Sequence, residues 1–441
     1  MSLGDRDPAG TKPDAPSPQP SSNDPDVAWR RCAFGGGAGM FVGMGLGRFS
    51  YTAMVPALIE SGTLTPLEAG RVGGSNLAGF FLGAVVSVPL AAMFGRVAVL
   101  WGALAIALIG LAGSALPVGF AWLAACRASL GVATALIMVL SLALIAETAP
   151  ADRRPEAGAY VFAGVGLGIS SSGILVPWLL TQGLSAAWLG ILLAGLAGCG
   201  LALWGWRGAP DTSPTPIRPA DAVARRSIFA PGLASLMLAH ALFSFGIVPH
   251  TIYWVDYVVR GVNLGSAAGG LHWTLVGLAA ALGPLLTTLL ARAIGTAAAL
   301  VAGFAILAVG ISLPALWPAT AVLFASSIIF GAQPGLSSLM AARARDLGDP
   351  AEMPRVMRAM ILANAAGGVL GGLSVPWVFA GGLAEVLPRD TTIAGPLLAV
   401  LAAGGHAPLF LLGGAAMALG ALFAGWRASA PVPPRQRQAG A

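Results

Sequence analysis

The sequence predicts an all-α integral membrane protein with twelve transmembrane helices, arranged as two pseudo-symmetric bundles of six. Three observations support this fold class. Charged residues make up 10% of the 441 residues and hydrophobic residues 56%, whereas roughly 25% are charged in ordinary soluble domains. The apolar residues gather in twelve runs, most of them close to the ~20 residues that a spanning helix requires. Short motifs also recur at an offset of six helices.

The predicted helices form two sets of six, separated by a charged, Pro-rich cytoplasmic linker at 207–228. The first bundle, 29–206, is expected to contain helices at 33–59, 71–94, 97–117, 119–147, 157–180 and 187–206. The second, 229–426, is expected to contain helices at 229–258, 268–290, 295–316, 319–341, 356–380 and 406–426. Residues 1–28 are predicted to be a disordered cytoplasmic tail, because they are rich in Pro, Ser and Asp, and 427–441 a second tail. Residues 381–405 are predicted to be a loop, with or without an interfacial helix.

Two motifs occur once in each half. Phe49-Ser50-Tyr51 with Pro56 resembles Phe243-Ser244-Phe245 with Pro249, and Gly173 to Trp178 matches Gly372 to Trp377. Both pairs lie six helices apart. This offset is typical of parallel repeats related by an axis along the membrane normal.

The arginines predict the orientation. Only Arg71, Arg260 and Arg389 fall on the side opposite the termini. Seventeen fall on the side of the termini: Arg30, Arg31, Arg96, Arg153, Arg154, Arg207, Arg218, Arg225, Arg226, Arg292, Arg343, Arg345, Arg355, Arg358, Arg427, Arg435 and Arg437. By the positive-inside rule both termini are cytoplasmic, in the plasma (inner) membrane. Topology also accounts for the net charge of +6, so no nucleic-acid partner is expected.

Polar residues concentrate in the first, fourth, seventh and tenth helices, whereas the third, sixth, ninth and twelfth helices contain very few polar residues. Such residues need a hydrated interior, which predicts a polar pathway between the bundles. The candidate substrate-binding residues are Arg48, Tyr51, Asn76, Arg127, Gln333 and Asn364. The candidate proton-coupling residues are His240, His250 and Asp256.

Each candidate also has a structural interpretation. Arg48 lies in a run from Ala33 to Ile59 without another charge, so it either contacts a substrate or braces the helix through backbone carbonyls. Arg127 is expected to be architectural. A His has an unperturbed pKa of about 6.5, which suits proton exchange, but it can also simply bond across helices. Asp256 could relay protons or pair with Arg260 at i+4.

The repeat, the six-plus-six layout and the linker resemble the major facilitator superfamily. Arg127-Ala128-Ser129-Leu130-Gly131 looks like its R-x-x-x-G motif, whereas Gly95-Arg96 is all that remains of its cytoplasmic loop signature, with Ala92 at the acidic position. Gly47 to Tyr51 with Pro56, Glu60-Ser61-Gly62, Ala69-Gly70 and Asn76 to Gly79 are similar to the YbfB/YjiJ group. This resemblance implies secondary transport and names no substrate.

The sequence therefore predicts a secondary transporter, not an enzyme, that moves a small polar, anionic organic solute by alternating access with proton coupling. It is expected to be a monomer in the lipid bilayer without cofactor or metal, since Cys32, Cys126 and Cys199 have no paired spacing and no nucleotide-binding loop occurs. One alternative is a proton-driven multidrug efflux pump, although no carboxylate lies at midplane. Another is a transporter-shaped membrane sensor or scaffold.

Overall fold

The computed structural model describes residues 25–210, 230–349, 352–386 and 395–425. The first bundle opens with a discontinuous span: α1 (Pro25–Met40), the π-helical segment η1 (Phe41–Leu46) and α2 (Ser50–Glu60). Its other helices are α3 (Pro66–Phe94), α4 (Arg96–Ser114), α5 (Phe120–Thr148), α6 (Arg154–Leu180) and α7 (Leu184–Gly205). Most of the predicted tails and linker lies outside the described residues, although α1 begins at Pro25, earlier than the sequence predicts.

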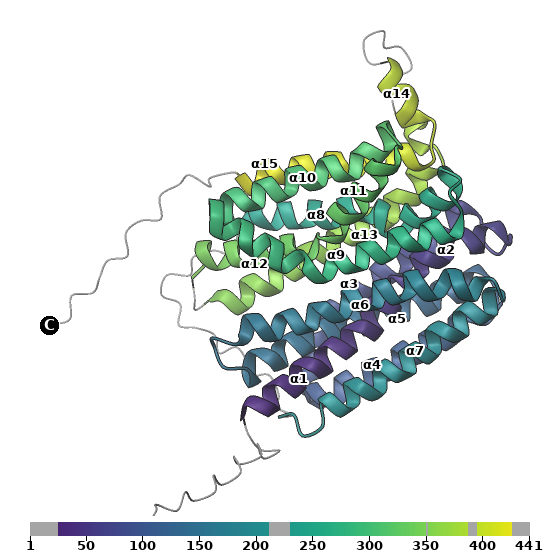
Figure 1. Ribbon diagram of the computed structural model, residues 1–441. Helices are drawn as coiled ribbons and strands as arrows, with labels where there is room; N and C mark the ends of the chain where they lie inside the picture. The colour runs from purple at the N-terminus through teal and green to yellow at the C-terminus, as the bar shows by residue number, and fades with distance from the viewer. Residues whose placement is uncertain (1–24, 211–229, 350–351, 387–394, 426–441) are drawn as a thin grey trace, which may run out of the picture.

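The second bundle repeats this plan. Its helices are α8 (Pro231–Asp256) with the π-helical extension η2 (Tyr257–Gly261), α9 (Gly265–Ile294), α10 (Thr296–Leu316), α11 (Thr320–Gly331), α12 (Pro334–Leu347), α13 (Met353–Phe379) and α15 (His406–Gly425). The stretch predicted as a loop contains the 3-10 turn η4 (Gly382–Glu385) and a short helix, α14 (Gly395–Ala402). Figure 1 shows α14 standing out from the body.

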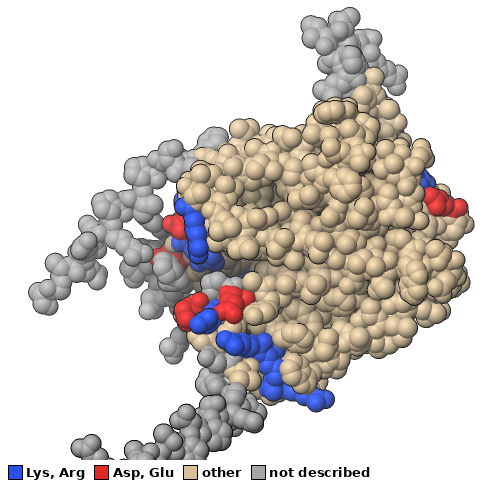
Figure 2. All heavy atoms as spheres, viewed as in Figure 1, with Lys and Arg blue, Asp and Glu red and all other residues tan. Residues whose placement is uncertain are grey.

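The structure confirms the predicted fold class. Eleven helices of the described part are long and apolar enough to cross a membrane, and α1, η1 and α2 together form the twelfth span. Alternating helices begin at opposite ends of the protein (Figure 1). We call the end at which α1 begins and α15 ends the terminal end, and the other the distal end. On the face seen in Figure 2, charged side chains gather at these two ends, and the surface between them carries none.

Local sequence explains where several helices begin. Thr65 and Glu68 form a reciprocal capping box at the start of α3, with Pro66 in the first helical position. Gly95 (φ +83°) separates α3 from α4, and Gly295 (φ +86°) separates α9 from α10 at the equivalent position of the other bundle. A side chain disfavours such φ values, so glycine suits both corners. Beside the first corner, Arg96 forms an ion pair with Glu147 at the end of α5.

The repeated Gly-x-x-x-Pro-Trp motif builds the two seams where the bundles meet. Across them α6 packs against α9 and α13 against α3. Gly372 faces Gly74, where an added Cβ would come within 2.5 Å of the Gly372 carbonyl oxygen, and Gly173 faces Gly270 in the same way. Both seams are therefore closed by backbone-to-backbone contact. The sequence repeat thus corresponds to a structural repeat at the interface.

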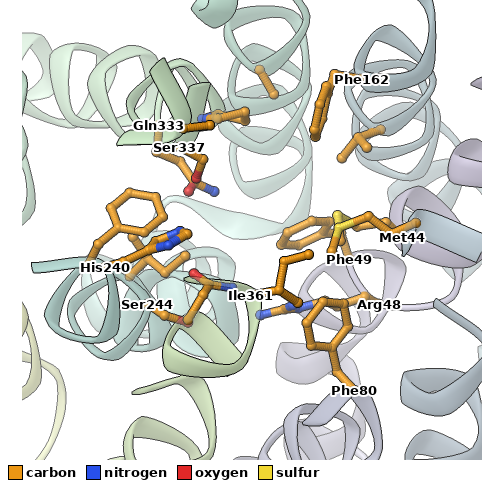
Figure 3. A pocket seen from close by; sticks show the side chains of 18 of the residues that line it. Met44, Arg48, Phe49, Phe80, Phe162, His240, Ser244, Gln333, Ser337 and Ile361 are labelled. Carbon is orange, nitrogen blue, oxygen red and sulfur yellow. The ribbon is translucent and has the colours of Figure 1, made fainter. Parts of the chain in front are cut away.

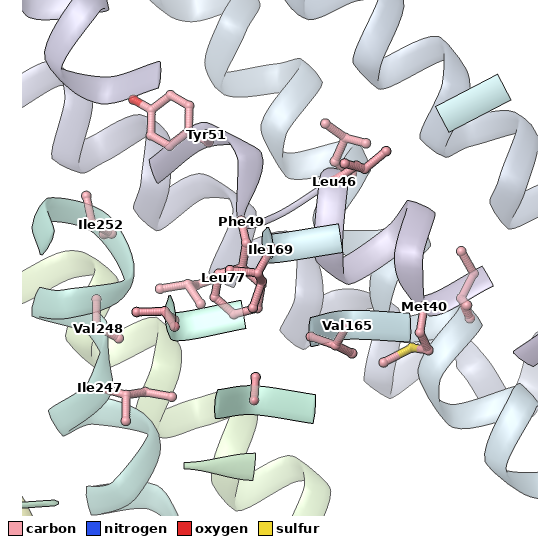
Figure 4. Packing of buried hydrophobic residues seen from close by; sticks show 14 of the residues in the cluster. Met40, Leu46, Phe49, Tyr51, Leu77, Val165, Ile169, Ile247, Val248 and Ile252 are labelled. Atoms are coloured by element: carbon pink, nitrogen blue, oxygen red, sulfur yellow. The ribbon is translucent and has the colours of Figure 1, made fainter. Parts of the chain in front are cut away.

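The seams are closed in the distal half. Four hydrogen bonds that join the bundles within the described residues lie there: Thr52 to the Thr251 carbonyl, Tyr253 to the Pro66 carbonyl, Trp273 to the Phe49 carbonyl and Ser170 to the Thr274 carbonyl. Figure 4 shows the buried apolar side chains around Phe49, with Leu77 and Ile169 beside it and Ile247, Val248 and Ile252 of α8 nearby. The bundles are thus in contact across the distal half, although a second cavity of about 490 Å³ lies between the distal ends of α2 and α6 on one side and of α8, η2 and α9 on the other.

Substitution of a packing glycine tests the helix contacts within one bundle. A Cβ at Gly79 of α3 would collide with the Ala128 carbonyl of α5, whereas a Cβ at Gly200 of α7 would meet nothing within 4 Å. We expect Gly79→Ala to lower the free energy of unfolding by about 1–3 kcal/mol, because α3 and α5 must separate. Gly200→Ala should be neutral or slightly stabilising, since alanine favours helix by up to ~1 kcal/mol. Thermal melting of purified protein would compare them, and equal melting temperatures would contradict this packing.

Candidate functional site

A cavity of about 290 Å³ lies between the two bundles. Its lining residues come from the middle and terminal halves of the helices, so it lies on the terminal side of the closed seams. The walls are mainly Phe, Met, Ile, Val and Leu side chains. The polar lining residues are Arg48, His240, Ser244, Gln333, Ser337 and Asn364. The cavity is therefore apolar with a few convergent polar groups, which is typical of small-molecule sites.

Arg48 enters this cavity from a break in the first span. The π-helical segment ends at Leu46, residues 47–49 form a turn, and the α-helix resumes at Ser50. Two buried side chains bond to backbone carbonyls at this break. Arg127 Nη2 donates to the Arg48 carbonyl at 2.9 Å, and Trp273 Nε1 donates to the Phe49 carbonyl at 3.2 Å. Irregular backbone at membrane depth is tolerated where protein groups satisfy it in this way.

The Arg48 guanidinium has aromatic neighbours and no counter-ion. Its Cζ lies 5.4 Å from the centre of the Phe49 ring and 5.7 Å from that of Phe80. Among the described residues no hydrogen bond or ion pair reaches this side chain, and Nε is buried without a partner. No described residue that lines the cavity is acidic. Figure 3 shows the guanidinium beside Phe80 and Ile361. An unneutralised cation in an apolar cavity favours an anionic ligand.

The second bundle contributes the remaining polar groups. His240 of α8 is 9% exposed, and its Nδ1 has no hydrogen-bond partner among the described residues. Gln333 lies at the break between α11 and α12, immediately before Pro334, and Asn364 lies on α13. In Figure 3 His240 and Gln333 lie across the cavity from Arg48. Four of the predicted site residues, Arg48, His240, Gln333 and Asn364, thus line one cavity.

Tyr51, Asn76 and Arg127 lie outside this cavity and bind the protein itself. The Tyr51 hydroxyl donates to the Ala69 carbonyl at 2.9 Å, and the Asn76 amide donates to the Arg127 carbonyl at 2.9 Å. The Arg127 guanidinium lies 4.9 Å from the centre of the Tyr51 ring and is fully buried. In this arrangement the three residues support the break that presents Arg48.

His250 lies in the interior of the second bundle, also outside the cavity. Its ring stacks on Trp254 at 4.6 Å and packs against Phe330 and Phe410. Its Nε2 lies 3.1 Å from the Ser326 hydroxyl. Phe330 lines the cavity, so one aromatic ring separates His250 from it.

Asp256 lies at the distal end of α8 and is fully buried. It pairs with Arg260 at i+4 (2.9 Å), as one reading of the sequence predicts, and also with His406 at the start of α15 (2.9 Å). Tyr253, Tyr257 and Phe379 pack their rings around His406. This cluster joins the seventh and twelfth spans.

Three of the residues that make these contacts are not predicted from the sequence to belong to a site. In the sequence, Phe49 belongs to the repeated motif and to the motif similar to the YbfB/YjiJ group, and neither His406 nor Trp273 is among the candidate site residues. A signal for Trp273 was present, because it lies inside a predicted helix rather than at a membrane interface. A buried indole N–H usually has an acceptor. Groups of three or more potential metal-ligating side chains do not occur in the part of the chain that the structure describes.

The fold, two six-helix bundles around a central cavity, is that of solved proteins of the major facilitator class. The structure resembles that of a D-xylose–proton symporter, with 18% identity and a TM-score of 0.68, covering 91% of this chain and 97% of that one. It also resembles a bacterial homolog of the human lysosomal transporter Spinster in an inward-facing, unoccupied conformation: 16% identity, TM-score 0.65, covering 90% and 96%. The inward-open xylose transporter XylE from E. coli is similar at 15% identity and TM-score 0.64, covering 90% and 95%.

The particular family follows from the sequence. Residues 40–424 match the family described as "Uncharacterised MFS-type transporter YbfB". The chain therefore belongs to this family of multi-pass membrane transporters. A comparison with curated protein sequences finds no match.

The Asp256 cluster allows a test of the distal end. We expect Asp256→Asn to lower the free energy of unfolding by about 2–4 kcal/mol, because a buried carboxylate with two partners would be replaced by a neutral group. Asp152, whose side chain is 77% exposed, pairs with Arg153 at 3.5 Å, and Asp152→Asn should change stability by at most ~1 kcal/mol. Thermal melting at neutral pH compares the variants. Equal effects would mean that the Asp256 pairs contribute no more than a surface pair.

Proposed function

We propose that this protein is a secondary active transporter that moves a small amphiphilic organic anion across the plasma membrane by alternating access, coupled to protons. The observation that carries the proposal is the uncompensated guanidinium of Arg48 in a cavity whose described lining residues include no carboxylate. Arginine stays protonated, so the cavity holds a permanent positive charge when it is empty. An anionic ligand neutralises that charge.

The apolar walls refine the class of substrate. Phe49 and Phe80 flank the guanidinium, and Phe162, Phe243 and Met360 line other walls. A solute with one anionic group and an aromatic or aliphatic body would bury its apolar surface at roughly 25 cal/mol per Å². A strongly hydrophilic solute would leave hydroxyl groups without partners, which costs free energy. The structure thus supports an anion that is more amphiphilic than the sequence alone suggested.

The orientation and the facing state belong to the same proposal. The arginine-rich terminal end is assigned to the cytoplasm by the positive-inside rule. The cavity then lies on the cytoplasmic side of closed distal seams, which is an inward-facing arrangement. Rocking of the two bundles would open the distal seams and close the terminal half.

His240 is the proposed proton-coupling residue. It lines the same cavity as Arg48, its Nδ1 has no partner among the described residues, and histidine changes its charge near neutral pH. His250 and Asp256 are less suited, because aromatic rings enclose His250, and Arg260 and His406 hold Asp256. A protonated His240 would add a second positive charge opposite Arg48, so anion and proton binding would favour each other.

Efflux of lipophilic drugs remains the second candidate, because the cavity walls are mostly apolar. The two functions differ in the charge of the ligand. Arg48 repels a lipophilic cation, whereas it binds an anion.

Matched ligands test the role of Arg48. Benzenesulfonate and benzenesulfonamide share a ring and differ in charge, and tetraphenylphosphonium represents the cations. We expect only benzenesulfonate to raise the melting temperature of the wild type, since a ligand at 100 times its Kd adds about 2.7 kcal/mol. Arg48→Gln should lose this effect, whereas Arg71→Gln, at the exposed start of α3, should keep it. Stabilisation by tetraphenylphosphonium in both wild type and Arg48→Gln would instead support drug efflux.

His240→Gln tests proton coupling. In proteoliposomes that contain a pH-sensitive dye, we expect benzenesulfonate to drive proton movement through the wild type and at least about tenfold less through His240→Gln, as one lost protonation site removes the coupling. Exchange of labelled benzenesulfonate across the membrane without a gradient should persist, because Arg48 still binds it. Loss of exchange together with proton movement would show that His240 binds the anion itself.

A further inference from the structure

The break in the first span is held from both bundles at once. Arg127 of α5, which bonds to the Arg48 carbonyl, belongs to the same bundle as Arg48. Trp273 of α9, which bonds to the Phe49 carbonyl, belongs to the other bundle. Relative movement of the bundles leaves the first bond in place and must strain or break the second.

Trp273 is also connected to Arg48 through the side chain of Phe49. Its ring packs against that of Phe49, with the ring centres 6.0 Å apart and the planes at 60°. Phe49 in turn lies beside Arg48, whose Cζ is 5.4 Å from the Phe49 ring centre. Trp273 is 0% exposed and does not line the cavity. Its contacts therefore fix Phe49 in position, and Phe49 in turn contacts Arg48.

The other polar contacts across the distal seams are made by residues that do not line the cavity. Thr52 bonds to Thr251 and Tyr253 bonds to Pro66, both toward the distal end of the first span and α3. Ser170 bonds to the Thr274 carbonyl, one residue after Trp273, at 3.2 Å. Among these bonds, that of Trp273 is the one whose acceptor adjoins Arg48. It is thus placed to connect closure of the seam with the shape of the site.

We propose that Trp273 is a positioning residue that makes the anion site depend on the facing state. When the distal seams are closed, the indole holds the carbonyl and ring of Phe49 and so sets the position of Arg48. When the seams open, α9 moves away and the break is held by Arg127 alone. A ligand that binds better to the closed arrangement then favours closure by its difference in affinity between the two states. The effect of Trp273 on ligand binding rests on the proposed anion site, whereas the role of Trp273 in closing the seam does not.

The test compares two fully buried tryptophans, one whose indole N–H bonds across the seam and one whose indole N–H bonds within a bundle. Trp254 is also 0% exposed, but its Nε1 donates to the Ser327 hydroxyl at 3.1 Å, within the second bundle. Trp273→Phe and Trp254→Phe each remove one indole N–H and keep an aromatic ring. Trp273→Tyr, which also lacks the indole N–H, is measured in parallel so that the result does not depend on one variant folding.

The reporter is a cysteine in place of Ile252, in a chain whose Cys32, Cys126 and Cys199 are replaced by alanine. Ile252 is 2% exposed and lies against Gly73 across the seam. A membrane-impermeant maleimide added on the distal side reacts with it only when the seam opens. We expect Trp273→Phe and Trp273→Tyr to speed labelling about fivefold, the effect of losing one hydrogen bond. Trp254→Phe should label at the parent rate. An unchanged rate in both Trp273 variants, or an equal rise in Trp254→Phe, overturns the proposal.

Benzenesulfonate separates the two halves of the proposal. It should slow labelling of the parent chain and slow that of Trp273→Phe at least about threefold less, because the link from seam to site is lost. An equal slowing in both chains overturns the coupling role of Trp273. If benzenesulfonate has no effect on the parent while Trp273→Phe still labels faster, the anion site fails and the role of Trp273 at the seam stands.

Discussion

The break at residues 47–49 is the constraint on which the rest of the structure depends. It places freed backbone groups and a guanidinium at membrane depth, where water is scarce and each unsatisfied group costs several kcal/mol. The chain satisfies these groups from within. The Gly47 amide bonds back to the Val42 carbonyl at 2.7 Å, Thr134 of α5 donates to the Gly43 carbonyl at 2.6 Å, and Arg127 and Trp273 donate to the Arg48 and Phe49 carbonyls. The Arg48 side chain at this break has no polar partner among the described residues, and it lines the cavity.

The two bundles meet through contacts that suit a movable interface. At the seams glycine approaches glycine, as at Gly74 and Gly372, so the backbones touch there. The seam hydrogen bonds are single bonds from hydroxyl or indole groups to carbonyls, each worth about 1 kcal/mol net, and no ion pair joins the bundles in the described part of the chain. An interface of this kind can open without stranding a charge. The contacts of Asp256 with Arg260 and His406 lie instead inside the second bundle, where they join the distal end of α8 to the start of α15.

The sequence predicted the fold well because the membrane restricts the possibilities. Twelve apolar runs can become little other than spanning helices, and the repeated Gly173 and Gly372 motifs indicated two related halves. The sequence predicts the residues of the site less completely. Arg48, His240, Gln333 and Asn364 were named from their polarity alone, and they share a cavity. Tyr51 and Asn76 are just as polar, yet they bond to backbone carbonyls. Polarity shows that a residue in the membrane needs a partner, and only the packing shows whether that partner is the protein or a ligand.

The charge of Arg48 and the apolar walls of the cavity together restrict which solutes the protein could carry. A cationic solute would bring a second positive charge beside Arg48 with no carboxylate among the described lining residues to offset it, and in a low-dielectric site that repulsion is weakly screened. A neutral polyol would find few hydrogen-bonding groups, since most of the wall is Phe, Met and aliphatic carbon. An anion with an apolar body meets both conditions, because its charge neutralises Arg48 and its body displaces water from the rings. Likeness to a xylose symporter at 18% identity therefore describes the scaffold, whereas the proposed substrate class follows from the residues that this chain places in the cavity.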